Sequence, residues 1–403
     1  MTNCWRLLCP LAGVLLAALC LGCTQAPPKS ATANHEAAVS SHDGGSAACM
    51  VATVNPYATR AGVAAFERGG NALDAAIAAA LTLGVVDSSN SGIGGGCFIL
   101  IRTPGGEVAA IDGREIAPAA ATRDMYLRDG EADPALSQTG ALAVAVPGAL
   151  AAYELAIQRH GQLTLADLLR PAADLAAAGF PIDRVLAARI EANQDDLARF
   201  AGARSVFLKR DRTPWPRKHL LKQPDLAKTY RAIADEGVDW FYRGPFADKV
   251  GEWMRGNGGI LTAEDFAAYR AVEREPLRTS YRQWTIVGFP PPSSGGVHVG
   301  QILNMLERFD MAEEYRRDPA QALHLVAEAM KRAFADRAHW LGDPDFVDVP
   351  RGLLDQAYAD ELARRIDPRR AVAVAGHGDP PGAAEDVFGK KHTTHNAAVD
   401  SDG

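Results

Sequence analysis

The sequence KKHTTHNAAVD at residues 390–400 places two threonines, Thr393 and Thr394, between a stretch without periodicity and an alternating, strand-like segment. Threonine is a weak nucleophile unless a base lies beside it. A chain cut immediately before a threonine supplies that base, because the new α-amino group has a reference pKa of about 7.7–8.0 and can accept the hydroxyl proton. By itself, however, a threonine pair before a strand is a common pattern, so it leaves this chemistry open.

Upstream of the threonines, strand-like and helical patterns alternate. Two short apolar runs, 97–102 and 107–112, are separated by Thr-Pro-Gly-Gly and predict a hairpin. Helices are predicted to begin after Asn71, with Asp74 three positions later, and after Thr164. Further helices are expected at 57–68, 183–200, 224–236, 245–255, 297–309 and 318–340, strands at 141–146 and 279–289, and a mobile loop at 367–391. These patterns fit a layered α/β or α+β domain and leave its topology open.

The longest predicted helix, 318–340, carries one apolar face. Its expected core residues recur at helical spacing and are Ala322, Leu325, Val326, Ala329, Ala333 and Phe334. This face predicts that the helix packs against a neighbouring layer.

The N-terminus predicts export. Residues 7–22 form an apolar run behind Arg6, which is too short to span a bilayer comfortably but is typical of a signal peptide. The run ends in Cys-Leu-Gly-Cys, which resembles the bacterial lipoprotein signal with lipidation at Cys23; plain secretion is the alternative. Residues 23–48, rich in Ser, Ala, Pro and Gly, are predicted to be a flexible tether. We therefore expect a periplasmic or membrane-anchored protein with 1–22 removed.

Composition excludes several classes of function. The 403 residues include 42 Lys and Arg against 49 Asp and Glu, without a basic cluster, so nucleic acid is not an expected partner. Four of the six cysteines precede residue 24, leaving Cys49 and Cys97 in the body; whether these two pair stays open. Neither cysteine nor histidine spacing predicts a metal site, and no cofactor is expected.

Three segments of the body are candidates for chemistry. Residues 91–96, Ser-Gly-Ile-Gly-Gly-Gly, resemble a phosphate loop, but they follow a helix and enter a strand, the reverse of the dinucleotide order, so a tight strand start is preferred. Residues 112–115, Asp-Gly-Arg-Glu, present Arg114 at a strand end; its planar fork suits a carboxylate, although a surface ion pair is the simpler account. Residues 290–296, Pro-Pro-Pro-Ser-Ser-Gly-Gly, suit either an anion site at a helix start or a rigid connector.

Together these segments resemble the γ-glutamyltranspeptidase family of N-terminal-nucleophile hydrolases over residues 50–403. The matching motifs, in the family's order, lie at 71–76, 91–96, 112–115, 290–296, 341–346 and 393–395. The resemblance implies an α+β fold, a four-layer αββα sandwich, and a precursor that cuts itself into two subunits that stay together. The large subunit would be 49–392, and residues 393–403 would begin the small one.

The resemblance also assigns roles to individual residues. The cut bond would be His392–Thr393, and Thr393 would then attack the γ-glutamyl amide of glutathione or a related compound. Water, an amino acid or a dipeptide would take the γ-glutamyl group from Thr393. Arg114 matches the arginine that pairs with the substrate's α-carboxylate, which replaces the ion-pair interpretation; the pairing is bidentate and would place the γ-carbonyl at the nucleophile.

The sequence departs from the family pattern in two places. Cys97 follows the glycine run where the family often has glycine. The family's small subunit continues past the threonine segment and supplies oxyanion donors, so a chain ending at Gly403 is expected to hold an incomplete sandwich and to be inactive alone. Two alternatives remain: an acylase of the same fold that acts on glutaryl or cephalosporin-type amides, and a non-catalytic binding lipoprotein.

Overall fold

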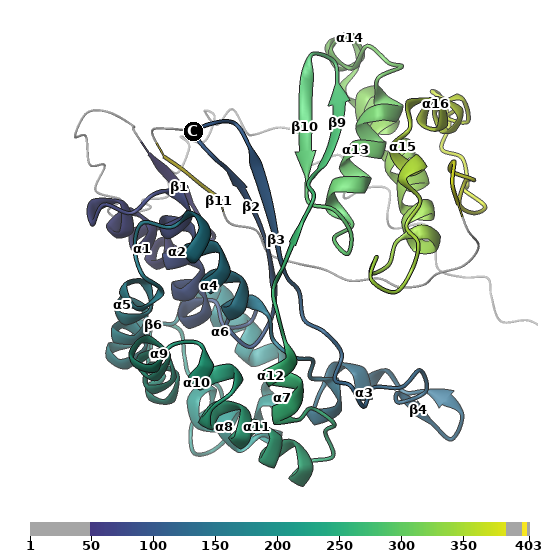
Figure 1. The fold of residues 1–403 in the computed structure, drawn as a ribbon. Coiled ribbons are helices and arrows are strands. Elements are labelled where there is room, and N and C mark those ends of the chain that lie inside the picture. The colour runs from purple at the N-terminus through teal and green to yellow at the C-terminus, as the bar shows by residue number, and fades with distance from the viewer. Residues whose placement is uncertain (1–48, 384–396, 401–403) are drawn as a thin grey trace, which may run out of the picture. The chain divides into compact units, whose positions relative to one another are not determined.

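Strands β2 (Cys97–Arg102) and β3 (Val108–Gly113) form the predicted hairpin and pair antiparallel, with Cys97 opposite Gly113 (Figure 1). The computed structural model describes residues 49–383 and 397–400, which belong to one compact unit. Strand β8 (Val272–Arg274) pairs with β3, giving the order β2-β3-β8, and α4 (Ala149–His160) packs against β2 and β3. The hairpin turn closes at Gly106, whose φ of +86° favours glycine.

The N-terminal helices form around the capping residues that the sequence marks. Asn71 and Asp74 make a capping box at the start of α2 (Ala72–Val86), and Thr164 and Asp167 make another at the start of α5 (Leu165–Ala178). Helix α1 (Pro56–Glu67) packs on α2, and α5 packs on α2 and on α9 (Pro224–Glu236). The remaining helices of this part are α6 (Arg184–Ala192), α7 (Gln194–Arg199), α8 (Ala201–Phe207), α10 (Asp239–Tyr242), α11 (Pro245–Gly256) and α12 (Ala263–Ala268).

One hydrophobic core joins these helices to the β2–β3 hairpin. Its largest fully buried side chains include Tyr230 and Phe241. The Tyr230 hydroxyl donates to Leu81 O at 3.1 Å, so the buried phenol keeps a hydrogen-bond partner. Short elements at the edges of this part are β4 (Leu127–Arg128), β5 (Glu131–Ala132), α3 (Pro134–Gln138), η1 (Ala141–Ala143), β6 (Phe180–Pro181) and β7 (Leu220–Leu221).

A second core lies among the later helices. Helix α13 (Gly295–Leu306) packs against α15 (Pro319–Trp340), α16 (Gln356–Arg364) and the hairpin of β9 (Leu277–Tyr281) and β10 (Trp284–Gly288). Helix α14 (Met311–Arg317) and the turn η2 (Arg351–Leu354) complete this group. None of the helices in the described part of the chain is long and apolar enough to cross a membrane.

Two predicted elements were wrong in kind. Residues 279–289, expected as one strand, form the β9–β10 hairpin, because the chain turns at Arg282 with φ +55°. That turn has no glycine or asparagine to mark it; the Glu307 carboxylate stabilises it by accepting from the Arg282 N–H at 3.1 Å. Residues 141–146 form the 3₁₀ turn η1 and a single bridge from Val146 to Ile116, because a short apolar run specifies burial but not strand geometry.

Two predicted helices differ in detail. The expected helix 183–200 is broken between α6 and α7 at Asn193, whose side-chain amide donates to Arg189 O at 2.8 Å and competes with the helical backbone. On α15, Ala322, Leu325, Ala329 and Ala333 are buried as predicted. Phe334, expected in the same core, is 50% exposed.

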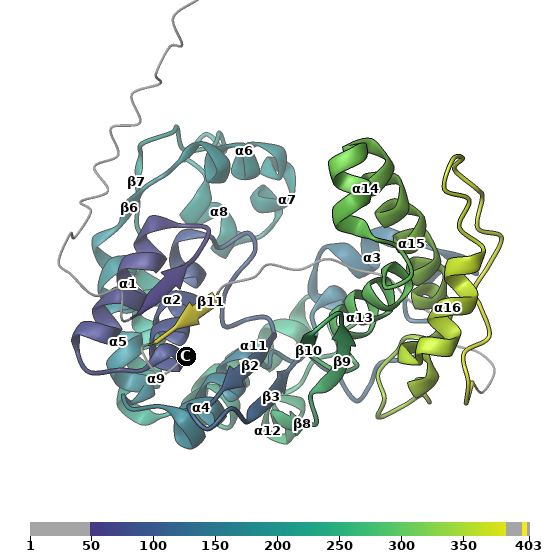
Figure 2. The same cartoon turned by 90° about the horizontal axis from the view of Figure 1, so that it is seen from above.

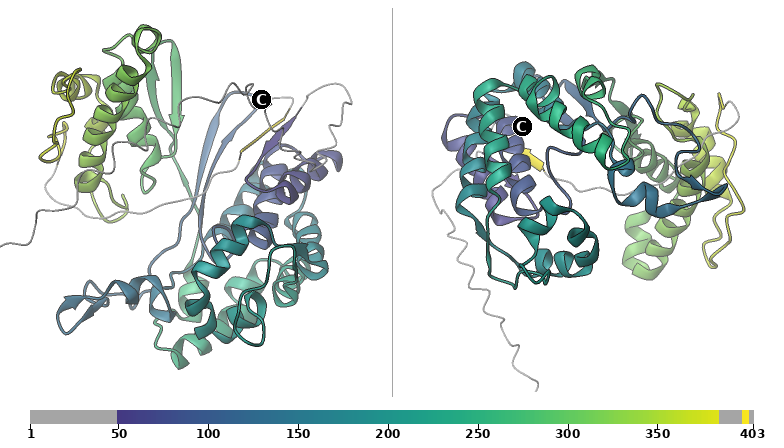
Figure 3. Two further views of the ribbon diagram at one scale, coloured as in Figure 1. Left: turned by 180° about the vertical axis from the view of Figure 1, so that it is seen from behind. Right: turned by 90° about the horizontal axis from the view of Figure 1, so that it is seen from below.

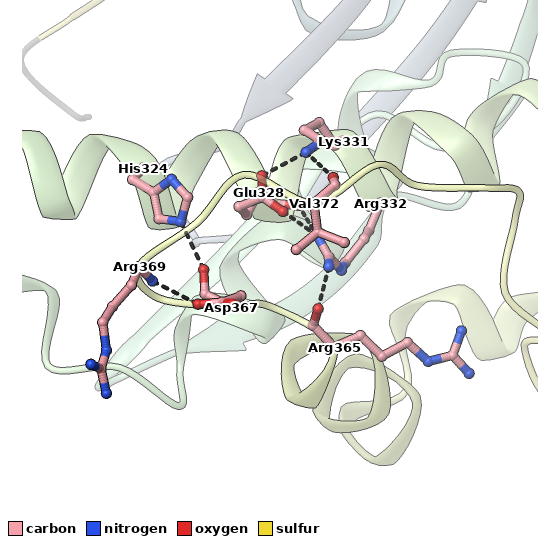
Figure 4. Close-up of polar contacts among 8 residues, drawn as sticks. All are labelled: His324, Glu328, Lys331, Arg332, Arg365, Asp367, Arg369 and Val372. Atoms are coloured by element: carbon pink, nitrogen blue, oxygen red, sulfur yellow. Dashed lines mark hydrogen bonds and ion pairs between the residues drawn. The ribbon is translucent and has the colours of Figure 1, made fainter.

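The polar side of α15 holds the irregular segment that follows α16 (Figure 4). Glu328 and Arg332 are buried on this side, with Arg332 Nη1 2.9 Å from Glu328 Oε2. Arg332 donates to Arg365 O, and Lys331 donates to Glu328 Oε1 at 2.6 Å and to Val372 O. Residues 367–383 contain no helix or strand, as expected, and Lys331 holds the Val372 carbonyl within them. The expected mobility of this loop stays a prediction. Residues 384–391 of that loop lie outside the described residues.

The same side of α15 continues this pattern one turn at a time. Toward its start, His324 Nε2 lies 2.8 Å from Asp367 O. Toward its end, the buried carboxylate of Asp336 accepts from Gly378 N at 2.7 Å, and Trp340 Nε1 donates to Gly378 O at 3.0 Å. One face of α15 therefore provides hydrogen-bond partners for backbone groups of this segment, which lies in no sheet or helix of its own.

Strand β11 (Ala397–Val399) returns to the beginning of the described chain. It pairs antiparallel with β1 (Met50–Ala52), and it lies beside β1 and near α1 and α2 in each view (Figure 2, Figure 3). Asp400 Oδ2 then accepts from Ala72 N, at the start of α2, at 3.1 Å. This pairing fixes the chain that follows the threonine segment.

Candidate active site

Arg114 stands at the end of β3 on a backbone held from two sides. Its N–H donates to Asp112 Oδ1 at 2.9 Å, and its carbonyl oxygen accepts from the Tyr269 hydroxyl at 2.7 Å. The side chain is exposed, with Cζ 5.9 Å from the centre of the Phe98 ring. Within residues 49–383 and 397–400 no carboxylate pairs with the Arg114 guanidinium. The surface ion pair weighed from the sequence is therefore not formed there, and the fork is open to an anion.

Asp112, two residues earlier, connects Arg114 to a distant motif. Its Oδ2 accepts from Arg274 Nε at 2.6 Å, and the two Nη atoms of Arg274 bind both oxygens of Asp345 at 3.2 and 2.8 Å. The Arg274 guanidinium lowers the pKa of the Asp345 carboxyl by donating these hydrogen bonds. The motif at 341–346 is thus joined to the strand end that carries Arg114.

The glycine run at 91–96 meets the same strand end. Gly96 N donates to Glu115 Oε1 at 2.7 Å, and Gly95 O accepts from Gly148 N at 3.0 Å. A Cβ on Gly96 would lie 2.6 Å from Gly113 O, closer than backbone atoms tolerate. The run is a tight strand start, as preferred from the sequence.

Cys97, the first residue of β2, is not a nucleophile in this setting. Burial raises the pKa of its thiol to about 12, and the nearby carboxylates of Glu115 and Asp112 act in the same direction. The thiol therefore stays neutral and unreactive near neutral pH. Both Cys49 and Cys97 are free in the structure, which answers the question of their pairing.

The segment 290–296 approaches Arg114 through an aromatic contact. The Phe289 ring, immediately before it, lies 4.4 Å from the Phe98 ring. Ser293 Oγ accepts from Gly295 N at 3.3 Å, and a Cβ on Gly296 would lie 2.3 Å from Phe289 O. These internal contacts fit a rigid connector, and the alternative of an anion site at the helix start stays a prediction.

His392 and Thr393 lie outside the described residues, so their predicted roles stay predictions. The described chain resumes at Ala397, four positions after Thr393, in β11. Through Asp400, β11 contacts the 71–76 motif at the start of α2. Asp74 in that motif is buried and accepts from Asn71 N at 2.8 Å and Gln162 N at 3.0 Å.

Sequence reasoning missed Arg274 and Tyr269 as parts of this site. Arg274 is an ordinary strand arginine in the sequence, and its partners lie 162 and 71 positions away. A pattern of local spacing does not indicate such pairs. The one available indication was that Asp112 and Asp345 belong to motifs of the same resemblance.

A family model described as Gamma-glutamyltranspeptidase matches residues 58–403. The chain belongs to the γ-glutamyltranspeptidase family. It is 42% identical over 357 residues to the glutathione hydrolase proenzyme of Escherichia coli, covering 88% of this chain and 61% of that protein. It is also 41% identical to the acylase ACY 1 proenzyme of Pseudomonas sp. SE83, covering 80% of this chain and 59% of that protein. The chain thus spans about three-fifths of these relatives.

Solved structures agree with this membership. γ-Glutamyltranspeptidase from Helicobacter pylori matches with a TM-score of 0.78 and 37% identity, covering 81% of this chain and 94% of that chain. A cephalosporin acylase from Bacillus halodurans matches with a TM-score of 0.74 and 30% identity, covering 88% of this chain and 64% of that one. The mixed helix and strand fold of γ-glutamyltranspeptidases and their acylase relatives is therefore the fold of this chain.

Proposed function

We propose that the chain belongs to a γ-glutamyltranspeptidase and glutathione hydrolase precursor that moves γ-glutamyl groups from glutathione or other γ-glutamyl amides to water, amino acids or peptides. The observation that carries the proposal is Arg114: an exposed guanidinium, without a carboxylate partner in the described chain, on a backbone held by Asp112 and Tyr269. The relatives named glutathione hydrolase support the substrate class.

In the proposed reaction, the precursor first cuts its own His392–Thr393 bond. The freed α-amine of Thr393 accepts the proton of the Thr393 hydroxyl as its oxygen attacks the γ-carbonyl carbon. The amide C–N bond breaks, the leaving amine takes that proton, and a γ-glutamyl ester remains on Thr393. Water or an acceptor amine then attacks the ester and restores the hydroxyl. Arg114 holds the α-carboxylate so that the γ-carbonyl reaches the nucleophile.

The finer architecture and the location are part of the same proposal. We propose a four-layer αββα sandwich made by a large subunit, 49–392, and a small subunit beginning at Thr393, supported by the likeness to solved family members. Residues 1–22 act as a signal peptide, 23–48 as a tether, and Cys23 carries a lipid that anchors the exported protein.

An acylase that accepts glutaryl or cephalosporin-type amides is the second candidate. It is favoured by the acylase relatives, which match with identities close to those of the hydrolases. Rates of release from γ-glutamyl and glutaryl anilides separate the two, because glutaryl lacks the α-amino group. Faster release from the glutaryl anilide would favour the acylase.

The test of the main proposal uses the full-length gene product. Thr393→Ala is expected to prevent cleavage of the His392–Thr393 bond, which gel electrophoresis and N-terminal sequencing will detect. Normal cleavage in this variant would show that Thr393 is not the nucleophile. Arg114→Lys keeps the charge but loses the fork, so KM for a γ-glutamyl donor should rise about tenfold or more. The exposed arginine Arg278 gives the matched control, Arg278→Lys, with unchanged KM.

A further inference from the structure

Arg274 occupies the point where three segments of the chain meet. It is the last residue of β8, opposite Ala110 of β3, and its side chain is only 14% exposed. Its Nε binds the buried Asp112, and its Nη atoms bind Asp345 of the 341–346 motif. One planar group therefore holds two carboxylates from segments that are far apart in the sequence.

Asp112 links Arg274 to Arg114 at the end of β3. One carboxylate oxygen accepts a hydrogen bond from Arg274 Nε at 2.6 Å, and the other accepts one from the Arg114 N–H at 2.9 Å. Both Asp112 oxygens are thus used, one on each side. Arg274 thus contacts one side of the Asp112 carboxylate, whose other side provides one of the two hydrogen bonds that hold the Arg114 backbone.

Phe98 completes the arrangement on the side-chain side. It lies opposite Asp112 in the β2–β3 register, and its ring contacts both the Arg114 guanidinium and the Phe289 ring. A shift of the Arg114 backbone would move its guanidinium away from the Phe98 ring. The Asp112 carboxylate is buried, and its ion pair with Arg274 offsets the cost of burying a polar group there.

We propose that Arg274 is a positioning residue for Arg114, acting through Asp112 and held in turn by Asp345, and that this relay gives the site its selectivity for donors with a free α-carboxylate. The proposal rests on the proposed function, in which Arg114 binds that carboxylate. Arg274 itself does not touch the donor; its effect appears only where the donor engages Arg114.

The kinetic test compares two donors that differ only in the carboxylate, γ-glutamyl p-nitroanilide and 4-aminobutyryl p-nitroanilide. Arg274→Gln is expected to raise KM for the first about tenfold, the size of one lost charge-assisted hydrogen bond, with a smaller change in kcat. For the second donor, kcat/KM should stay within about twofold of the unaltered protein, because that donor makes no bond to Arg114. An equal fall for both donors would overturn the proposal and leave Arg274 a merely structural residue.

Matched variants guard against a folding defect. Glu273→Gln alters the neighbouring residue of β8, which forms an exposed ion pair with Arg159 at 3.4 Å. This variant should leave KM and kcat unchanged for both donors. Arg274→Lys should shift KM less than Arg274→Gln does. If Arg274→Gln does not fold, Asp345→Asn replaces it, because Asp345 is 57% exposed; a rise in KM confined to the γ-glutamyl donor supports the relay, and no such rise opposes it.

A second readout needs no catalysis. Hydrogen exchange of the Arg114 amide, measured on the full-length Thr393→Ala protein, should become faster in Arg274→Gln and stay unchanged in Glu273→Gln. Unchanged exchange in Arg274→Gln would contradict the relay even if the protein is active. Lack of γ-glutamyl release by the unaltered protein, with faster exchange in Arg274→Gln, would instead reject the proposed function and keep the relay.

Discussion

Replacing Glu328 by glutamine is expected to destabilise the protein strongly, because it removes the charge that balances Arg332 inside α15. Glu328 is 2% exposed and Arg332 5%, and the two are linked at 2.9 Å (Figure 4). After the change, Arg332 still donates to the backbone carbonyl oxygens of residue 328 and Arg365, but it has lost the carboxylate at position 328. Breaking one side of a buried ion pair costs about 3–5 kcal/mol; the glutamine oxygen still accepts a bond, so we expect the lower end, about 3 kcal/mol.

Urea unfolding at neutral pH, followed by tryptophan fluorescence, measures this loss on the full-length Thr393→Ala protein. The control is Glu313→Gln on α14, whose pair with Arg316 is 51% and 70% exposed and should be worth less than about 1 kcal/mol. A double change, Glu328→Leu with Arg332→Met, should recover much of the lost stability, because apolar residues of similar volume can replace a buried ion pair without leaving an unpaired charge. The reasoning is refuted if Glu328→Gln costs no more than Glu313→Gln.

Three other changes test the surroundings of the site. Gly148→Ala should lower stability by about 1–3 kcal/mol, because its Cβ would lie 2.4 Å from Gly113 O; an unchanged melting temperature would contradict this. In the folded protein, iodoacetamide at mildly alkaline pH should modify the exposed Cys49 and spare Cys97, whose thiol pKa is raised to about 12, as peptide mass spectrometry will show. Arg274 lowers the pKa of the Asp345 carboxyl below its ordinary value of 3.8, so the pair stabilises the folded protein fully above pH 3.8. This stabilisation is lost as the pH falls through the lower pKa of the folded state. Asp345→Asn should therefore weaken the dependence of urea unfolding on pH in that acidic range.

Local chemistry explains which parts of the fold the sequence predicted. The capping boxes at Asn71 and Thr164 lie within a few residues of the helices they start, so the sequence marks them directly. The turn at Arg282 has a positive φ without glycine and depends on Glu307 from another element, so no local pattern indicated it. Phe334 fitted the helical period but lies on an exposed face, because tertiary packing decides which face is covered.

The candidate site divides in the same way. Arg114 was identified because a family motif contains it, and its position at a strand end was predicted from the hairpin. Its support by Arg274 and Tyr269 depends on how separate segments pack, which periodicity does not encode. The segment 367–378 shows no periodicity for the same reason: several of its backbone groups are held by side chains of α15, which lie far from it in the sequence.

The pairing of β1 with β11 has a consequence for the protein after the proposed self-cleavage. In the uncut chain, both strands belong to one polypeptide, so they meet at an effective concentration that does not depend on dilution. A cut at His392–Thr393 lies between them in sequence and places β11 on a second polypeptide. The same hydrogen bonds then join two molecules, and their stability follows the law of mass action. Cleavage therefore changes the molecularity of this contact without requiring any change in its geometry.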